Sequence, residues 1–135
     1  MKKILLTALA VAFLLTAKAQ SVDTTKKDTD KVFLSPEKAP QFPDGIEQFY
    51  DYLERNIHYP SEARAKQEQG SVVVIMIVEK DGSLSNVKVA RHVSPSLDQE
   101  AVRVISASPK WIPGTQNGRP VRSMHTIPIA FSLGK

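Results

Sequence analysis

One stretch constrains the fold of this chain more than any other: residues 71–79 read SVVVIMIVE, with seven consecutive apolar residues rich in β-branched side chains. Lys80-Asp81-Gly82 follows directly. A run of this length that ends in Asp-Gly predicts a β-strand entering a hairpin turn. Because the run is apolar at odd and even positions alike, we expect it to be buried on both faces, at the centre of a sheet.

Two more strands are predicted after this run. Residues 84–93 return with alternating apolar and polar side chains, which is typical of a half-exposed strand. Residues 121–133 form the last predicted strand, with apolar side chains at a strict period of two at Ile127, Ile129, Phe131 and Leu133. Pro128 falls on the opposite parity, and its missing N–H restricts this last strand to an edge or to pairing on one side only.

Helical periodicity appears in two segments, and Pro60 precedes a short third helix predicted over residues 61–67. The order of elements predicts an α+β fold, in which a three-stranded antiparallel sheet carries two main helices on one face. The first apolar stripe consists of Ile46, Phe49, Tyr50, Leu53 and Ile57, and the second of Leu97, Ala101, Val104 and Ile105.

The loop between the last helix and the last strand, PKWIPGTQNGRP at 109–120, contains the only tryptophan of the chain. An exposed indole in a Pro- and Gly-rich loop would form an apolar surface patch that promotes aggregation. We therefore expect Trp111 to be buried and to close one end of the core. The structural residues of this loop are Trp111 and the turn-forming Pro113, Gly114 and Gly118.

The N-terminus predicts export. MKK is followed by the apolar run Ile4–Leu15 and by small residues at Ala17 and Ala19, which is the pattern of a secretory signal peptide over residues 1–19, cleaved before Gln20. The run is shorter than the roughly 20 residues that a membrane-spanning helix requires. The alternative is an uncleaved N-terminal anchor.

Residues 20–41 are polar and charged, with a single apolar island at Val32-Phe33-Leu34, and predict a flexible linker. The folded domain is expected over residues 42–135. With no cysteine in the chain, packing alone must hold this domain together. An exposed edge strand is also compatible with a homodimer formed by edge pairing or strand exchange.

Charge and motif content exclude several classes of function. The chain has 18 basic and 14 acidic residues, but removal of the signal peptide leaves 15 basic residues, without a basic cluster that would indicate nucleic acid. Three histidines occur singly, without metal-ligand spacing, and no cofactor motif is present. Asp98 and Glu100 fit the first turn of a helix, where carboxylates favour the helix dipole. We therefore predict neither an enzyme nor a metal or cofactor site.

Several short motifs occur in order between residues 40 and 133 and together resemble the C-terminal domain of the energy-transducing TonB family. Each motif is weak alone, and their order makes the resemblance specific. The motifs are FPDG at 42–45, YPSEA at 59–63, GSVVV at 70–74, DG at 81–82, LDQEAVRV at 97–104, PKWIPG at 109–114, NGRPV at 117–121 and IPIAF at 127–131.

The resemblance implies a periplasmic domain that binds outer-membrane transporters, in energy transduction for nutrient uptake. In this family the short N-terminal box of a transporter adds a strand to the edge formed by the last strand, and residues just before the Tyr-Pro also contact the box. An inner-membrane, proton-driven motor supplies the force. Carried over, the partner-binding residues are His58, Tyr59, Arg122, Ser123, Met124, His125, Thr126 and Ile127.

Two other classes of function stay open. The N-terminal run looks cleavable, and a linker of about 20 residues reaches at most about 70 Å. The chain is therefore also compatible with a soluble periplasmic interaction module, such as a sensor, a decoy or a partner of a membrane protease, that shares the domain without coupling to the motor. A small secreted enzyme is the third class, for which the sequence offers no site.

Overall fold

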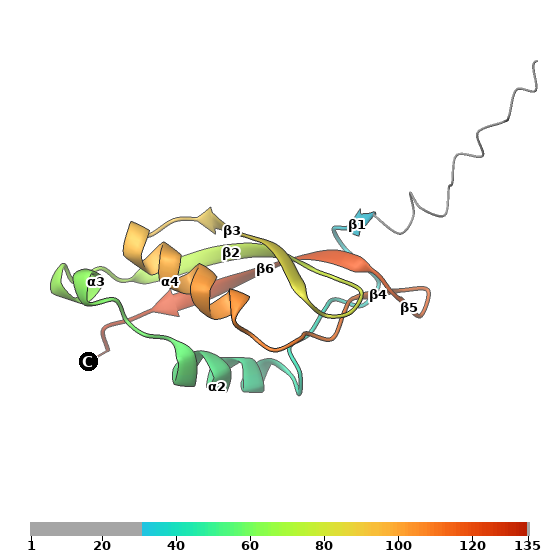
Figure 1. Cartoon of the computed structure of the whole chain (residues 1–135), viewed down its shortest axis with the longest axis horizontal. Helices are drawn as coiled ribbons and strands as arrows, with labels where there is room; N and C mark the ends of the chain where they lie inside the picture. The colour runs from blue at the N-terminus through green and yellow to red at the C-terminus, as the bar shows by residue number, and fades with distance from the viewer. Residues whose placement is uncertain (1–30, 135) are drawn as a thin grey trace, which may run out of the picture.

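The computed structural model describes residues 31–134. The predicted signal peptide and the first half of the predicted linker lie outside the described residues. The elements, shown in Figure 1, are β1 (Val32–Phe33), α2 (Ile46–Asn56), α3 (Ser61–Ala65), β2 (Gly70–Val78), β3 (Leu84–Arg91), α4 (Pro95–Ser106), β4 (Thr115–Gln116), β5 (Arg119–Pro120) and β6 (Arg122–Phe131).

The apolar run predicted to be central is β2, and it lies between β3 and β6 as expected. Its pairing with β6 is antiparallel and unbroken, from Gly70 opposite Phe131 to Val78 opposite Ser123. Its pairing with β3 is also antiparallel and contains two irregularities of register. The hairpin turn falls at Asp81-Gly82, where the Glu79 N–H donates to the Ser83 carbonyl at 2.8 Å.

The prediction of a three-stranded antiparallel sheet is wrong in one respect, because the sheet described over residues 31–134 is four-stranded and mixed, in the order β1-β6-β2-β3. The additional strand, β1, comes from the apolar island of the predicted linker. It runs parallel to β6, with Val32 opposite Arg122 and Phe33 opposite Ser123. A strand edge with unpaired N–H and C=O groups accepts such a segment readily.

The rest of the described linker also packs on the domain. The backbones of Lys38 and Thr115 exchange two hydrogen bonds of 3.1 and 3.0 Å, and those of Gln41 and Ile112 exchange two of 2.9 and 2.8 Å. Structure therefore begins by Val32, ten residues before the predicted boundary at Phe42. The loop that receives this segment folds into the small β4-β5 hairpin, which turns at Asn117-Gly118, where both residues have positive φ.

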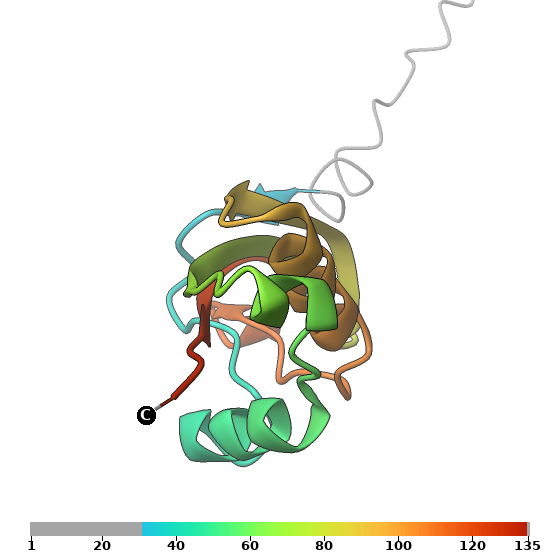
Figure 2. The ribbon, with the colours of Figure 1, turned by 90° about the vertical axis from the view of Figure 1, so that its left-hand side faces the viewer.

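The helices lie on one side of the sheet (Figures 1 and 2). Helix α4 packs against β2 and β3, and all four members of its predicted stripe are fully buried. On α2 only Phe49 and Leu53 are buried, whereas Ile46 is 55% and Tyr50 60% exposed. The sequence therefore predicts too wide a buried face for α2, because the helix contacts the core through only part of the predicted stripe.

Candidate functional site

The predicted partner-binding segment, residues 122–127, lies within β6, and we call the side of this strand that faces away from β2 the β6 outer edge. Strand β1 covers this edge at Arg122 and Ser123. From Met124 to Phe131 no strand of the described part of the chain pairs with it. The open part of the β6 outer edge therefore begins at Met124.

Pro128 indicates which backbone groups this edge presents. It lies opposite Val73 of β2, and since proline has no N–H, its nitrogen is expected to face away from β2. Backbone groups of alternate residues point to the same side of a strand. We therefore expect Met124 and Thr126 to direct their N–H groups outward, where they would donate hydrogen bonds to the carbonyl oxygens of an added strand.

Side chains of β6 alternate between its two faces. Ser123 and Ile127 are buried on the face that carries the helices, whereas Thr126 and Pro128 are exposed on the opposite face. An added strand would thus have a packed core on one side and solvent on the other.

Arg122 ties the start of β6 to the end of β2. Its Nε donates to Oε1 of Glu79 at 2.5 Å, and its Nη2 donates to Oε2 at 3.2 Å. The hydrogen bond from Arg122 lowers the pKa of Glu79, against a smaller opposing effect of burial. Arg122 was predicted as a contact for a partner, and the structure gives its guanidinium a partner within the sheet.

His125 lies against Trp111, with ring centroids 5.5 Å apart. Burial lowers the pKa of His125, so the ring is neutral at pH 7. Trp111 is 4% exposed, which confirms its predicted burial. Its ring meets those of Phe42 and Phe49 at 5.5 and 5.6 Å, and its Nε1 donates to Ser108 Oγ at 3.1 Å.

Three glycines hold the surrounding loops in close contact or in a tight turn. A Cβ on Gly114 would lie 2.8 Å from Ser123 Oγ and 3.0 Å from the Lys38 carbonyl oxygen. Gly82 approaches the Trp111 backbone even more closely. Gly118, at φ 74°, has open space around it and serves the β4-β5 turn.

Two apolar hollows lie between α2 and β6. They were not predicted, because the sequence suggested that Ile46 and Tyr50 would be buried. One, of about 290 Å³, is lined by Pro40, Gln41, Phe42, Gly45, Ile46, Trp111, His125 and Ile127. The other, of about 420 Å³, is lined by Tyr50, Leu53, Glu54, Ile57, Ser71, Pro128 and Ala130. Apolar surface therefore flanks the open part of the β6 outer edge.

The structure does not place His58 and Tyr59 beside the start of this edge. The Tyr59 ring packs on Phe131, the last residue of β6, with centroids 5.8 Å apart. Phe131 lies seven positions after Met124, a distance of about 23 Å along a strand. These two predicted contacts directly precede α3 in the chain, and α3 lies at the C-terminal end of β6 (Figure 1).

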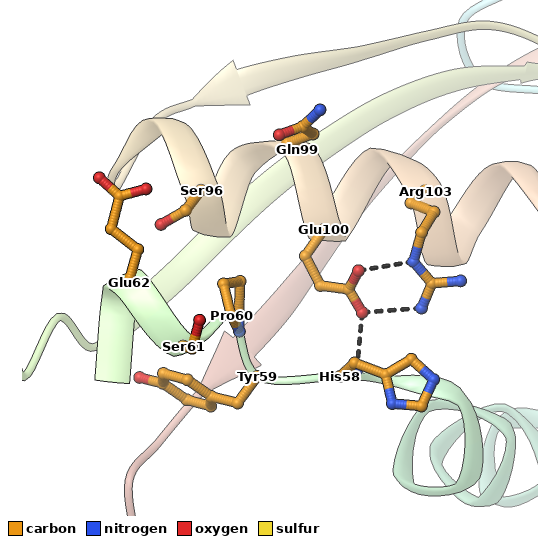
Figure 3. A pocket seen from close by; sticks show the side chains of 9 residues that line it. All are labelled: His58, Tyr59, Pro60, Ser61, Glu62, Ser96, Gln99, Glu100 and Arg103. Carbon is orange, nitrogen blue, oxygen red and sulfur yellow. Dashed lines mark hydrogen bonds and ion pairs between the residues drawn. The ribbon is translucent and has the colours of Figure 1, made fainter. Parts of the chain in front are cut away.

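Glu100 holds this second region together (Figure 3). It is 8% exposed, and Oε2 accepts the His58 N–H at 2.6 Å. Arg103 donates to both carboxylate oxygens, at 2.6 and 2.8 Å, and to the Asn56 carbonyl at 2.8 Å. Burial opposes ionisation of Glu100, but the bonds from Arg103 and His58 outweigh it and lower the pKa.

The role of Glu100 differs from the predicted interaction with the helix dipole. Its Arg103 partner lies three residues along α4, a spacing at which side chains meet on a helix, so the pair could have been predicted. The contact with His58 joins residues 42 apart and has no local signal. A hollow of about 510 Å³ lies beside these residues, lined by residues 58–62 and by Ser96, Gln99, Glu100 and Arg103.

Two further properties of residues 31–134 concern metal binding and membrane insertion. No three His, Cys, Asp or Glu side chains in that range are grouped so that they could hold a metal ion. No helix in the same range is both long and apolar enough to span a membrane. The arrangement that remains is a partly open strand edge beside apolar hollows, which is suited to binding an extended peptide.

Comparison with known proteins agrees with this architecture. The NMR solution structure of the Helicobacter pylori TonB C-terminal domain matches with a TM-score of 0.51 and 23% identity, over 70% of this chain and 90% of that one. A shorter fragment of the same domain gives a TM-score of 0.49 and 23% identity, over 66% of this chain and 94% of that one. No curated protein matches.

A family model described as Gram-negative bacterial TonB protein C-terminal matches residues 55–133, more than half of the chain. This match takes in α3, α4 and the three antiparallel strands, and it confirms the resemblance inferred from the sequence motifs. The chain belongs to the family of TonB C-terminal domains.

Proposed function

We propose that this chain binds the N-terminal box peptide of an outer-membrane TonB-dependent transporter by strand addition at the β6 outer edge, in energy transduction for nutrient uptake. Domains of this family are periplasmic, non-enzymatic interaction domains associated with transport, and they interact with outer-membrane transporters in general. Export with cleavage before Gln20 belongs to the proposal.

One observation carries the proposal: β6 pairs with β2 from Ser123 to Phe131 on one side, but has a strand neighbour at only two residues on the other side. Such an edge leaves N–H and C=O groups that an extended peptide satisfies by β-augmentation. Backbone pairing supplies affinity and tolerates many side chains, while pockets beside the edge select among them.

The hollows between α2 and β6 supply that selectivity. Ile46 and Tyr50 expose more than half of their surface beside them, and exposed apolar side chains gathered at a groove are typical of binding surfaces. We propose that the partner places apolar side chains here, at alternate positions of its strand. His58 and Tyr59 contact the part of the partner that continues past Phe131.

The test is a titration of the isotope-labelled mature chain, residues 20–135, with a synthetic box peptide from a transporter of the same organism. Amide shifts should change at Met124–Ile127 and, through the hollows, at Ile46 and Tyr50. The matched control is the same peptide with proline at its central position, which should bind far more weakly. Shift changes confined to β3 or to the Asp81-Gly82 turn would contradict the assignment.

A further inference from the structure

We infer that the segment Lys31–Leu34 is an intramolecular occupant of the β6 outer edge, which a partner strand must displace. The inference rests on the proposed function, since it concerns how the same edge becomes available. It goes beyond that function because it gives the N-terminal segment a role in controlling affinity.

Strand β1 occupies the start of the segment proposed to receive the partner. Val32 and Phe33 lie opposite Arg122 and Ser123, the first two residues of the segment proposed to receive the partner. A second chain cannot pair with these two residues while β1 is in place, because each strand edge accepts one neighbour.

The part of the β6 outer edge that β1 leaves uncovered has only a short uninterrupted stretch. The open edge runs from Met124 to Phe131, but Pro128 has no N–H, so the uninterrupted stretch next to β1 is only Met124–Ile127. On the outward parity Met124 and Thr126 alone can donate there. Strands in proteins are most often about five to six residues long, so a partner of ordinary length that pairs with an uninterrupted run of this edge needs the positions that β1 covers.

Strand β1 is attached less firmly than the chain that follows it. Its pairing covers two residues, Leu34 is 71% exposed, and the side chains of Val32 and Phe33 are only partly buried. Lys31 adds a contact between its ammonium group and the Phe33 ring, 4.8 Å from the centroid. These few contacts must offset the conformational entropy that the extended segment loses when it is held on the edge.

The chain beyond β1 is held by more bonds. Glu37 exchanges two hydrogen bonds with the Gln116 side chain, of 3.0 and 3.1 Å. Lys38 and Gln41 each exchange two backbone hydrogen bonds with the loop before β6, and Phe42 is buried. Residues 31–34 can therefore leave the edge while residues from 37 onward stay in place, with the change of direction at Ser35-Pro36.

Occupancy by β1 reduces the apparent affinity for a partner by the fraction of molecules in which the edge is free. A variant that cannot form β1 should therefore bind a box peptide more tightly, although the residues that contact the peptide are unchanged. Loss of a residue that contacts the peptide would instead lower the affinity.

The experiment compares three mature chains: the natural one, the double variant Val32→Pro with Phe33→Pro, and the control Leu34→Ala. Proline removes the N–H groups of β1, whereas Leu34 belongs to the same apolar island but lies outside the pairing. Each chain is titrated calorimetrically with the same synthetic transporter box peptide. We expect the Kd of the double variant to fall about three- to thirtyfold and that of Leu34→Ala to stay within about twofold.

The outcomes separate this inference from the proposed function. Equal affinity of all three chains would overturn the displacement of β1 and leave strand addition standing. Binding by none of them would overturn the proposed function, and with it this inference. Thermal unfolding of each variant verifies that the domain is folded.

A second measurement uses the natural chain alone. When the peptide binds, the amide resonances of Val32 and Phe33 should move toward the positions of an unstructured segment, at the same peptide concentration that shifts Met124 and Thr126. Resonances of Val32 and Phe33 that stay unchanged at saturation would overturn the inference.

Discussion

Gly82 and Trp111 lie so close together that a Cβ on Gly82 would be 2.0 Å from the Trp111 carbonyl oxygen, and the Trp111 N–H donates to the Gly82 carbonyl at 2.8 Å. Gly82 also has φ 87°, which disfavours any side chain. The hairpin turn and the loop before β6 are thus joined backbone to backbone.

We expect Gly82→Ala to destabilise the domain by at least about 2 kcal/mol, because strain at positive φ adds to a clash with backbone atoms that cannot rotate away. Gly118→Ala is the matched control, since Gly118 has φ 74° and nothing within 4 Å of the added carbon. Urea denaturation measures both. A loss no greater for Gly82→Ala than for the control would contradict the close contact.

Trp111→Ala should lower the free energy of unfolding by about 3–5 kcal/mol, because it removes a ring packed between Phe42, Phe49 and His125. Ile112→Ala, at a neighbouring residue that is 51% exposed, should have little effect. Denaturant midpoints compare the two. If Trp111→Ala unfolded at the midpoint of the natural chain, this ring would not be part of the core.

Glu100 should make stability depend on pH in the acid range. Its pKa is lower in the folded chain than in the unfolded chain, so its stabilising contribution is present above the unfolded pKa of about 4.3 and is lost as the pH falls. Glu100→Gln should cost about 1–3 kcal/mol at pH 7 and should flatten the decline of stability between pH 6 and pH 3.

The control for this pH series is Glu47→Gln, which alters an exposed carboxylate on α2. Glu79 also has a lowered pKa, so the decline should be reduced by Glu100→Gln rather than abolished. Identical slopes for Glu100→Gln and for the natural chain would show that the contacts of Glu100 with Arg103 and His58 do not stabilise the fold.

Thr126→Pro should weaken binding of the box peptide by at least about tenfold, since it removes one of the two donors expected on the open edge between β1 and Pro128. Thr126→Val keeps the N–H and the shape of the side chain and should bind nearly as the natural chain does. Calorimetric titration measures both, after thermal unfolding has verified the fold. Equal binding of the two variants would mean that the peptide does not pair with this edge.

The sequence predicts well those elements whose signal is local. The stripe of α4, the Asp81-Gly82 turn and the central position of β2 all follow from periodicity and turn chemistry within a dozen residues, and the structure confirms each of them. Pro128 likewise predicts one-sided pairing where β6 has no second neighbour. In these segments local preference and tertiary packing agree.

Other features depend on contacts that a local pattern does not encode. Val32 and Phe33 pair with residues 90 positions later along the chain, and a two-residue strand has no periodicity to detect. Ile46 and Tyr50 share the helical spacing of Phe49, but the spacing alone does not indicate how much of α2 contacts the core. The contact between His58 and Glu100 is equally non-local.

Besides the contact of Glu37 with the Gln116 side chain, three backbone attachments hold the N-terminal segment, and they set the order in which a pulling force would act on it. Along the chain from Lys31 they are β1 on β6, then Lys38 with Thr115, then Gln41 with Ile112, and the core begins only at Phe42. Tension applied ahead of Lys31 would peel them off in that order, beginning with the two-residue strand. A modest pull would thus uncover the start of the β6 outer edge while the core stays folded. In the proposed mode of binding, the domain would then hold a strand partner more firmly under tension than at rest.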